Sequence, residues 1–148
     1  MKYSVPAHAV VLAGRLLIAL LFLHEGWIKL THLQASMAYM QNFGLPGVLL
    51  WPALALEIGG GLALLTGWAS RPFSLGLALF CVAAALIFHR NLEDGNQLLH
   101  FEKDLAIAGG LLAHAVAGPG RFAWPAAWLP PALRPWAGRG QADLTASE

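Results

Sequence analysis

Residues 48–69 read VLLWPALALEIGGGLALLTGWA, a 22-residue apolar run that contains one charged side chain, that of Glu57. Crossing the hydrocarbon core of a bilayer takes about 20 helical residues, so this segment is long enough to span it. Backbone polar groups cannot stay unpaired in lipid, which makes an α-helix the expected conformation. The run therefore predicts a membrane-spanning helix.

Three further apolar segments flank this one, and polar or turn-forming residues separate all four. They cover residues 7–30, 73–89 and 104–118, and the connections are GLPG (44–47), SRP (70–72) and RNLEDGN (90–96). Gly, Pro and Asn in such clusters are typical of turns. The sequence predicts an all-α membrane protein, a bundle of four transmembrane helices over residues 1–121.

The last part of the chain, residues 122–148, has a different composition. Its tryptophans alternate with prolines, and its final dozen residues are polar. Tryptophan is enriched where lipid headgroups meet water, so we expect an interfacial segment that grades into a disordered end. The residues concerned are Trp124, Trp128, Trp136, Pro125, Pro130, Pro131 and Pro135.

The overall composition excludes several classes of protein. Of the 148 residues 57% are hydrophobic and 11% are charged, against about 25% charged in a typical soluble domain. Mean hydropathy is +0.59 and net charge is +1, which argues against a disordered protein and against a nucleic-acid partner. The single cysteine, Cys81, excludes an intramolecular disulfide, a CxxC centre and a cysteine-based zinc site. The expected surroundings are the lipid bilayer.

The basic residues of the connections predict an orientation. One side of the predicted bundle is richer in lysine and arginine than the other, and the richer side faces the cytoplasm in most membrane proteins. This places both termini in the cytoplasm. The richer side holds Lys2, Arg71, Arg121, Arg134 and Arg139, and the other side holds Lys29, Arg90 and Lys103.

Arg15 and Glu57 lie deep within the first two predicted spans, where a charge costs at least about 2.5–3.5 kcal/mol and so calls for a partner. Arg15 lies about 12 Å along the first span, and Glu57 lies about 13 Å into the second from the opposite face. In an antiparallel pair across about 30 Å, these depths differ by about 5 Å. We predict an Arg15–Glu57 ion pair, which either specifies the helix register or lines a polar cavity.

A second polar group gathers at the outer end of the bundle. Glu25, Lys29 and His32 are spaced i, i+4 and i+7 and share one helical face, and Arg15 points to the same side. We expect this charged stripe to face the bundle interior, and His24 to face the other way.

His89, His100 and Lys103 fall on that outer side as well, with Glu93, Asp94 and Glu102. Histidine and carboxylate side chains within reach of one another can bind a metal, which makes His89 and His100 candidate ligands. No HxxxH spacing occurs, so an ordinary hydrogen-bonded polar rim is the alternative.

His114 belongs to a repeat of small residues at every fourth position, Ala106, Gly110 and Gly118 being the others. A matching repeat in the second span consists of Ala55, Gly59, Ala63 and Gly67. Such stripes allow membrane helices to approach closely, so we expect His114 to face a neighbouring helix. An inward histidine in a bundle can ligate haem, and a hydrogen bond to a neighbouring carbonyl or carboxylate is the alternative.

The ordered series of motifs over residues 10–121 resembles the DoxX family of small four-helix membrane proteins. The resemblance implies a bacterial or archaeal inner-membrane protein with polar positions at Arg15, Glu57, His89 and Lys103. Asp104 departs from the family pattern, which has Asn there, and FAW (122–124) replaces Ser-Leu-Asp. The matching motifs are GRLL (14–17), LHEGWIKL (23–30), GLP (44–46), ALEIGGGL (55–62), LTGW (65–68), ALIFH (85–89), FEKDLA (101–106), GGLL (109–112) and GPGR (118–121).

Family members are associated with membrane oxidoreductase complexes, including the thiosulfate–quinone type, and others with metal-peptide or solute handling. The first hypothesis is therefore a subunit or accessory protein of a quinone-linked oxidoreductase system. Arg15 and Glu57 would hold a quinone headgroup, with Glu25, Lys29, His89 and Lys103 completing the site. The chain shows no cysteine pair and no flavin or dinucleotide motif, so the electrons would come from a partner subunit.

Two alternatives stay open. One is a non-catalytic anchor or assembly factor in which the buried ion pair only specifies the bundle. The other is a metal- or solute-handling protein that uses the outer histidine and acid cluster, and it would need a homo-oligomer. Quinone, haem and metal are the candidate ligands, in that order.

Overall fold

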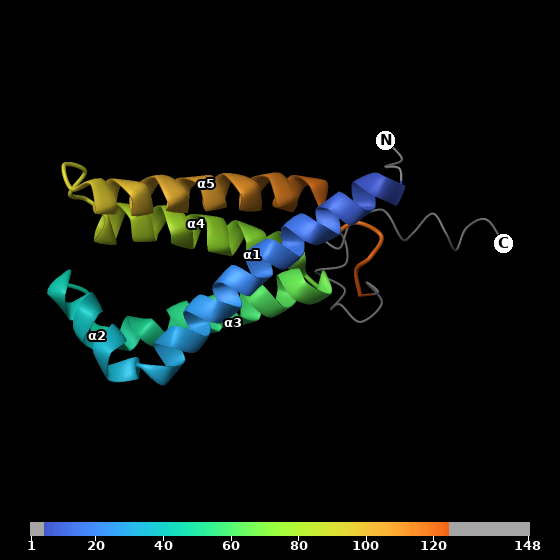
Figure 1. The fold of residues 1–148 in the computed structure, drawn as a ribbon. Helices are drawn as coiled ribbons and strands as arrows, with labels where there is room; N and C mark the ends of the chain where they lie inside the picture. Colours follow the sequence, from blue (N-terminus) through green and yellow to red (C-terminus); the bar gives the residue numbers. More distant parts are fainter. Residues whose placement is uncertain (1–4, 125–148) are drawn as a thin grey trace.

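The computed structural model describes residues 5–124, which form five α-helices and one short 3-10 helix (Figure 1). The all-α prediction is confirmed for this part of the chain, whereas most of the predicted tail lies outside it. The elements are α1 (Val5–Thr31), α2 (Leu33–Asn42), η1 (Gly47–Leu49), α3 (Leu50–Thr66), α4 (Ser70–Phe88) and α5 (Gly95–Ala117).

The helix boundaries follow from backbone chemistry at their ends. α3 ends at Thr66 because Gly67 takes a left-handed conformation with φ of 79°, which glycine adopts without steric cost. The connection predicted at 70–72 is instead the first turn of α4, where Pro72 is tolerated because its missing N–H needs no partner. α5 begins nine residues before the predicted 104, since the Asp94 side chain caps it by accepting a 2.9 Å hydrogen bond from the backbone N–H of Asn96.

Three helical stretches of the described chain are long and apolar enough to cross a membrane: Pro6–Thr31, Gly47–Thr66 and Ser70–Phe88. They correspond to the first three predicted spans. At 23 residues α5 is also long enough, but its charged run Glu102, Lys103 and Asp104 sets it apart from these three. α2 was not predicted; it follows α1 after a break at His32 and packs beside η1.

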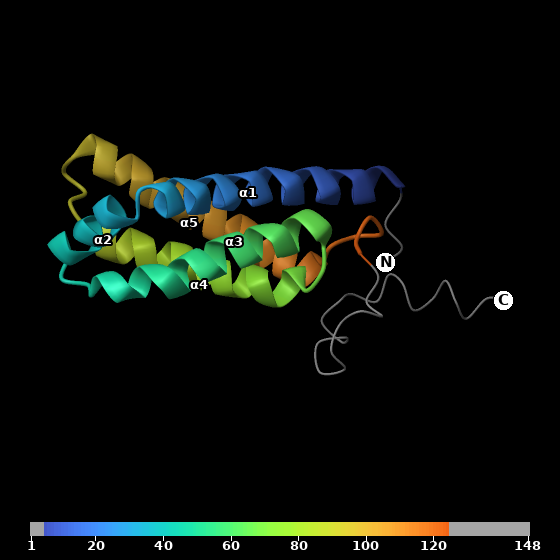
Figure 2. The ribbon, with the colours of Figure 1, turned by 90° about the horizontal axis from the view of Figure 1, so that it is seen from below.

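The helices form two antiparallel pairs, α1 with α3 and α4 with α5, and the packing of α3 on α4 joins them. Figures 1 and 2 show α2 and the α4–α5 connection at one end of the molecule, which we call the α2 end. The start of α1 and the end of α5 lie at the opposite end. α1 and α5 touch over a short stretch only and diverge toward the α2 end (Figure 1).

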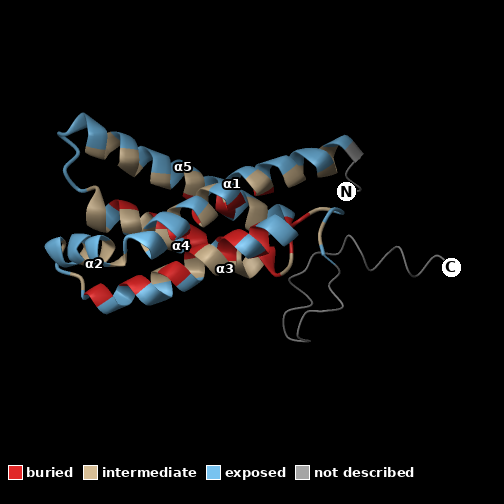
Figure 3. Cartoon of the chain, turned by 60° about the horizontal axis from the view of Figure 1, so that its bottom comes forward, coloured by how far each residue is buried: buried red, intermediate tan, exposed pale blue. Residues whose placement is uncertain are grey.

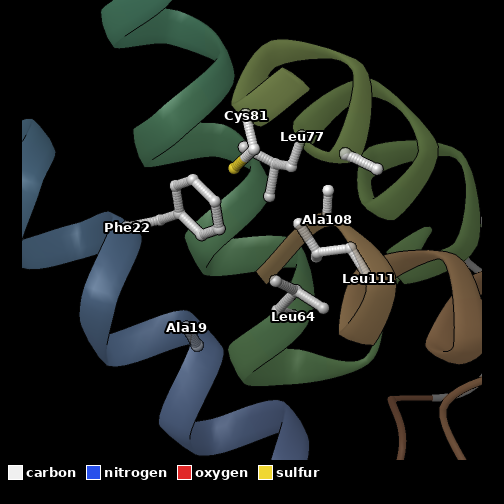
Figure 4. Close-up of a cluster of buried hydrophobic side chains, with 8 residues drawn as sticks. Ala19, Phe22, Leu64, Leu77, Cys81, Ala108 and Leu111 are labelled. Atoms are coloured by element: carbon white, nitrogen blue, oxygen red, sulfur yellow. The ribbon is translucent and has the colours of Figure 1, made fainter. Parts of the chain in front are cut away.

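The core lies where glycines of α3 allow the neighbouring helices α1 and α4 to pack closely against it. A Cβ on Gly60 would lie 2.7 Å from Leu77 of α4, and one on Gly61 would lie 2.8 Å from Leu23 of α1. Within α3 the closest approaches are at Gly60 and Gly61, whereas a Cβ on Gly59 of the predicted stripe would lie 3.4 Å from Phe73. Gly67, which follows α3 in that stripe, lies against the Arg15 side chain. Buried residues concentrate on α3 and α4 (Figure 3), and the central cluster contains Ala19, Phe22, Leu64, Leu77, Ala78, Cys81, Ala108 and Leu111 (Figure 4).

Candidate functional site

A cavity of about 630 Å³ lies at the α2 end, and residues of all five helices line it. Apolar and aromatic side chains form much of its wall, among them Phe22, Phe80 and Phe88, with Tyr39 of α2 stacked on Phe88 at 5.5 Å between ring centroids. We call it the polar cavity after the rest of its lining, which is Glu25, Lys29, His32, Ser36, Glu57, His89, His100, Lys103 and Asp104.

Lys29 is the centre of the charged group on the α1–α3 side of the polar cavity. Its Nζ lies 2.8 Å from Oε1 of Glu57 and 3.3 Å from Oε2 of Glu25, one turn earlier on α1. The Glu57 side chain is 3% exposed, that of Lys29 26% and that of Glu25 47%. One ammonium group therefore pairs with two carboxylates, one buried and one half-exposed.

The predicted Arg15–Glu57 ion pair is wrong, because Lys29 takes the place that was assigned to arginine. Of the predicted interior stripe, Arg15 is buried and Glu25 and Lys29 are half-buried, but His32 is exposed at the break after α1. His24, on the other side, is exposed as expected. Arg15 and Lys29, toward the two ends of this stripe, contact different parts of the molecule.

The stagger of α1 against α3 explains the error. Leu23 faces Gly61 and Gly26 faces Ile58. Continued along the two antiparallel helices, this register brings Arg15 to the end of α3, where its guanidinium group lies beside Gly67, about 15 Å along the helix axis from Glu57. The predicted depths of Arg15 and Glu57 assume that each span begins at a surface of the hydrocarbon core. In the structure α2 also packs against α3.

Histidines form the α4–α5 side of the polar cavity. His89 Nδ1 lies 2.8 Å from Oε1 of Gln97, and its Nε2 lies 3.8 Å from Oδ2 of Asp104. The rings of His89 and His100 stack with centroids 5.1 Å apart, and Lys103 donates to Nδ1 of His100 over 3.1 Å. His89, His100, Lys103 and Asp104 therefore form one connected polar group on this side of the cavity.

Sequence reasoning missed Asp104 as a site residue, although its spacing of four from His100 was a usable signal. It also missed Tyr39, because α2 was not predicted and nothing else in the sequence brings that residue to the site.

The metal hypothesis gains no support from the described residues. His89 and His100 lie together as predicted, but they stack face to face instead of converging on one point. Within residues 5–124 no group of three or more His, Cys, Asp or Glu side chains is arranged to hold a metal ion.

Arg15 lies at the opposite end, outside the polar cavity. Its Nη1 donates to the carbonyl of Pro119 over 2.8 Å, and its Nη2 donates to the carbonyl of Phe122 over 2.7 Å. Arg71 donates in the same way to the carbonyl of Val116 over 3.2 Å. These contacts satisfy carbonyls at and beyond the end of α5, so Arg15 fastens the segment 118–124 to the bundle.

His114 faces α4, as expected, and its Nε2 lies 3.1 Å from the Ser70 hydroxyl. The partner of this hydrogen bond is a hydroxyl instead of the carbonyl or carboxylate that the alternative to haem ligation named. His114 does not line the polar cavity.

The polar cavity combines features that suit a ligand with an aromatic ring and polar ends. Its volume falls within the about 300–1,000 Å³ of small-molecule pockets. Five of the six residues predicted for the buried polar site line it, Arg15 being the exception. Oε2 of Glu57 is buried and has no hydrogen-bond partner within the described chain.

Comparison with known proteins agrees with the motif series. The pattern of a family described as DoxX matches residues 10–90. The inner membrane protein YqjF of Escherichia coli K12 is 41% identical over 112 residues, which are 76% of this chain and 86% of that protein. The inner membrane protein YphA of the same organism is 25% identical over 118 residues, 75% of this chain and 84% of that protein. No solved structure matches the chain.

Proposed function

This chain belongs to the DoxX family, and from that premise we propose that it is a multi-pass inner-membrane subunit or accessory protein of a quinone-linked oxidoreductase system, with the ligand site in the polar cavity. The buried Glu57 carboxylate carries the proposal. It stands on the wall of an aromatic cavity with one oxygen paired and the other free. A buried polar atom without a partner is costly, so it marks a place where a ligand can complete the hydrogen bonding.

The proposed topology has four spans, with α5 as the fourth. Its 23 residues reach about 34 Å, enough for a core of about 30 Å. Asp104 lines the polar cavity and is partly buried there, so the protein interior shields its charge from lipid. The excess of basic residues in the connections favours both termini on the cytoplasmic side, which places the polar cavity near the outer surface.

The residues of the cavity have distinct tasks in this proposal. Lys29 and Lys103 supply donors for the oxygen atoms of the ring, and the aromatic wall of Phe22 and Tyr39 excludes water. A quinone supplies two-electron chemistry coupled to two protons. Glu25, half exposed, connects solvent with Lys29 and thus with Glu57, which offers a path for those protons. The electrons come from a partner subunit.

The test counts quinone in the full chain purified in mild detergent. We expect near-stoichiometric quinone on extraction, and saturable uptake of a short-chain ubiquinone after the bound molecule is removed. The Lys29→Met/Glu57→Leu double variant removes both members of the ion pair and should lose this uptake while its circular dichroism keeps the helical content. A chain that neither carries nor takes up quinone overturns the proposal and favours a non-catalytic anchor.

A further inference from the structure

We propose that the polar cavity binds the reduced, dihydroxy form of its quinone ligand more tightly than the oxidised form. This inference rests on the proposed function and adds the form of the ligand that the site selects. It starts from the hydrogen-bonding character of the one buried atom that lacks a partner in the cavity wall, Oε2 of Glu57.

Oε2 of Glu57 is an acceptor. The Lys29 ammonium lies 2.8 Å from the other oxygen of the same group and favours the ionised carboxylate, which has no proton to donate. The side chain is 3% exposed, so bulk water does not satisfy the free oxygen. The ligand that completes this site must therefore bring a hydrogen-bond donor.

The two redox forms of a quinone differ in this property. The oxidised form has two carbonyl oxygens, which only accept, whereas each hydroxyl of the reduced form can donate. A carbonyl placed against Glu57 would bring two acceptors together. A hydroxyl there makes a hydrogen bond to a buried charged group, and the difference corresponds to a preference of about tenfold or more.

The other polar groups of the cavity do not select in this way. Lys29 and Lys103 donate to a carbonyl and to a hydroxyl oxygen alike, and an imidazole donates or accepts according to its tautomer. The Asp104 carboxylate is 18% exposed and lies beside His89. The preference is therefore a property of Glu57.

The preference also has a redox consequence. Reduction of the bound quinone takes two electrons from the partner subunit and two protons, and one new O–H bond points at Glu57 and stays intact. Because the product is bound more tightly than the reactant, the bound couple is a stronger oxidant than the same quinone in the bilayer. A tenfold preference corresponds to about 30 mV for a two-electron couple.

The test measures anaerobic binding of a short-chain ubiquinone and of its quinol to the full chain in detergent. We expect the wild-type protein to bind the quinol at least about tenfold more tightly. Glu57→Gln should abolish or reverse this preference, because the amide presents a donor. The matched control Glu93→Gln makes the same change at an exposed glutamate outside the polar cavity and should leave the preference in place.

The outcomes separate the two proposals. If neither form binds, the quinone function itself fails. If the forms bind equally, or if Glu57→Gln keeps the wild-type preference, the inference is overturned and the quinone site stands. A redox titration of the wild-type protein with bound ubiquinone needs no variant: an unchanged midpoint potential relative to empty micelles also overturns the inference.

Discussion

At the scale of single residues, Lys29 neutralises a buried carboxylate on α3 and a half-exposed one on its own helix. Lys29→Met leaves Glu57 without its charged partner, and breaking a buried pair from one side costs about 3–5 kcal/mol. The Lys29→Met/Glu57→Leu double variant should recover most of that loss. Reversible unfolding in mixed micelles measures the free energy of unfolding of the single and the double variant. Glu25→Gln is the control, with an expected change of about 0–1 kcal/mol, and a single Lys29→Met variant as stable as wild type would contradict this account.

Arg15 belongs to a different part of the molecule, and its variants should show it. Arg15→Met removes two hydrogen bonds from a charged donor to the carbonyls of Pro119 and Phe122, each worth about 1.5–3 kcal/mol. We expect faster proteolysis within 118–124 and lower stability, with quinone binding in the polar cavity unchanged. Loss of binding at full stability would return Arg15 to the ligand site.

At the scale of the elements, the glycines of α3 determine how closely α1 and α4 approach. Gly61→Ala would place a methyl group 2.8 Å from the Leu23 side chain and 3.3 Å from its backbone nitrogen. Overpacking of this kind costs about 1–3 kcal/mol. Gly109→Ala on α5 is the matched control, because nothing lies within 4 Å of its new Cβ. The control should gain up to about 1 kcal/mol from helix propensity, and unfolding curves of the two variants should shift in opposite directions.

The elements also show how far sequence reasoning reaches. Apolar length predicted α1, α3 and α4, because a span needs little more than about 20 apolar residues. α2 escaped prediction because ten residues of mixed character between two breaks carry no such signal. The helical period placed Glu25 and Lys29 on the interior face, but the partner of Glu57 depends on the stagger of two helices, which Gly26, Gly61 and α2 determine through packing.

At the scale of the whole molecule, the proposed orientation puts the α4–α5 connection outside and the segment 118–124 in the cytoplasm. In intact cells, a membrane-impermeant maleimide should label Glu93→Cys but label Arg121→Cys only after the membrane is opened. Both positions are exposed, and the native Cys81 is buried. The reverse labelling pattern would show the opposite membrane orientation, with the polar cavity on the cytoplasmic side.

The divergence of α1 from α5 bears on how a ligand with a long isoprenoid chain reaches its site. Both helices bound the polar cavity, yet they touch over a short stretch only. In the proposed topology the interval between α1 and α5 faces the hydrocarbon phase, so the headgroup of the proposed quinone would pass sideways into the protein while its chain remains among the lipids. The ligand and the protein would then meet by diffusion within the plane of the membrane. Occupancy follows the mole fraction of the ligand in the membrane, and diluting the membrane with plain phospholipid empties the site even when the aqueous volume is constant.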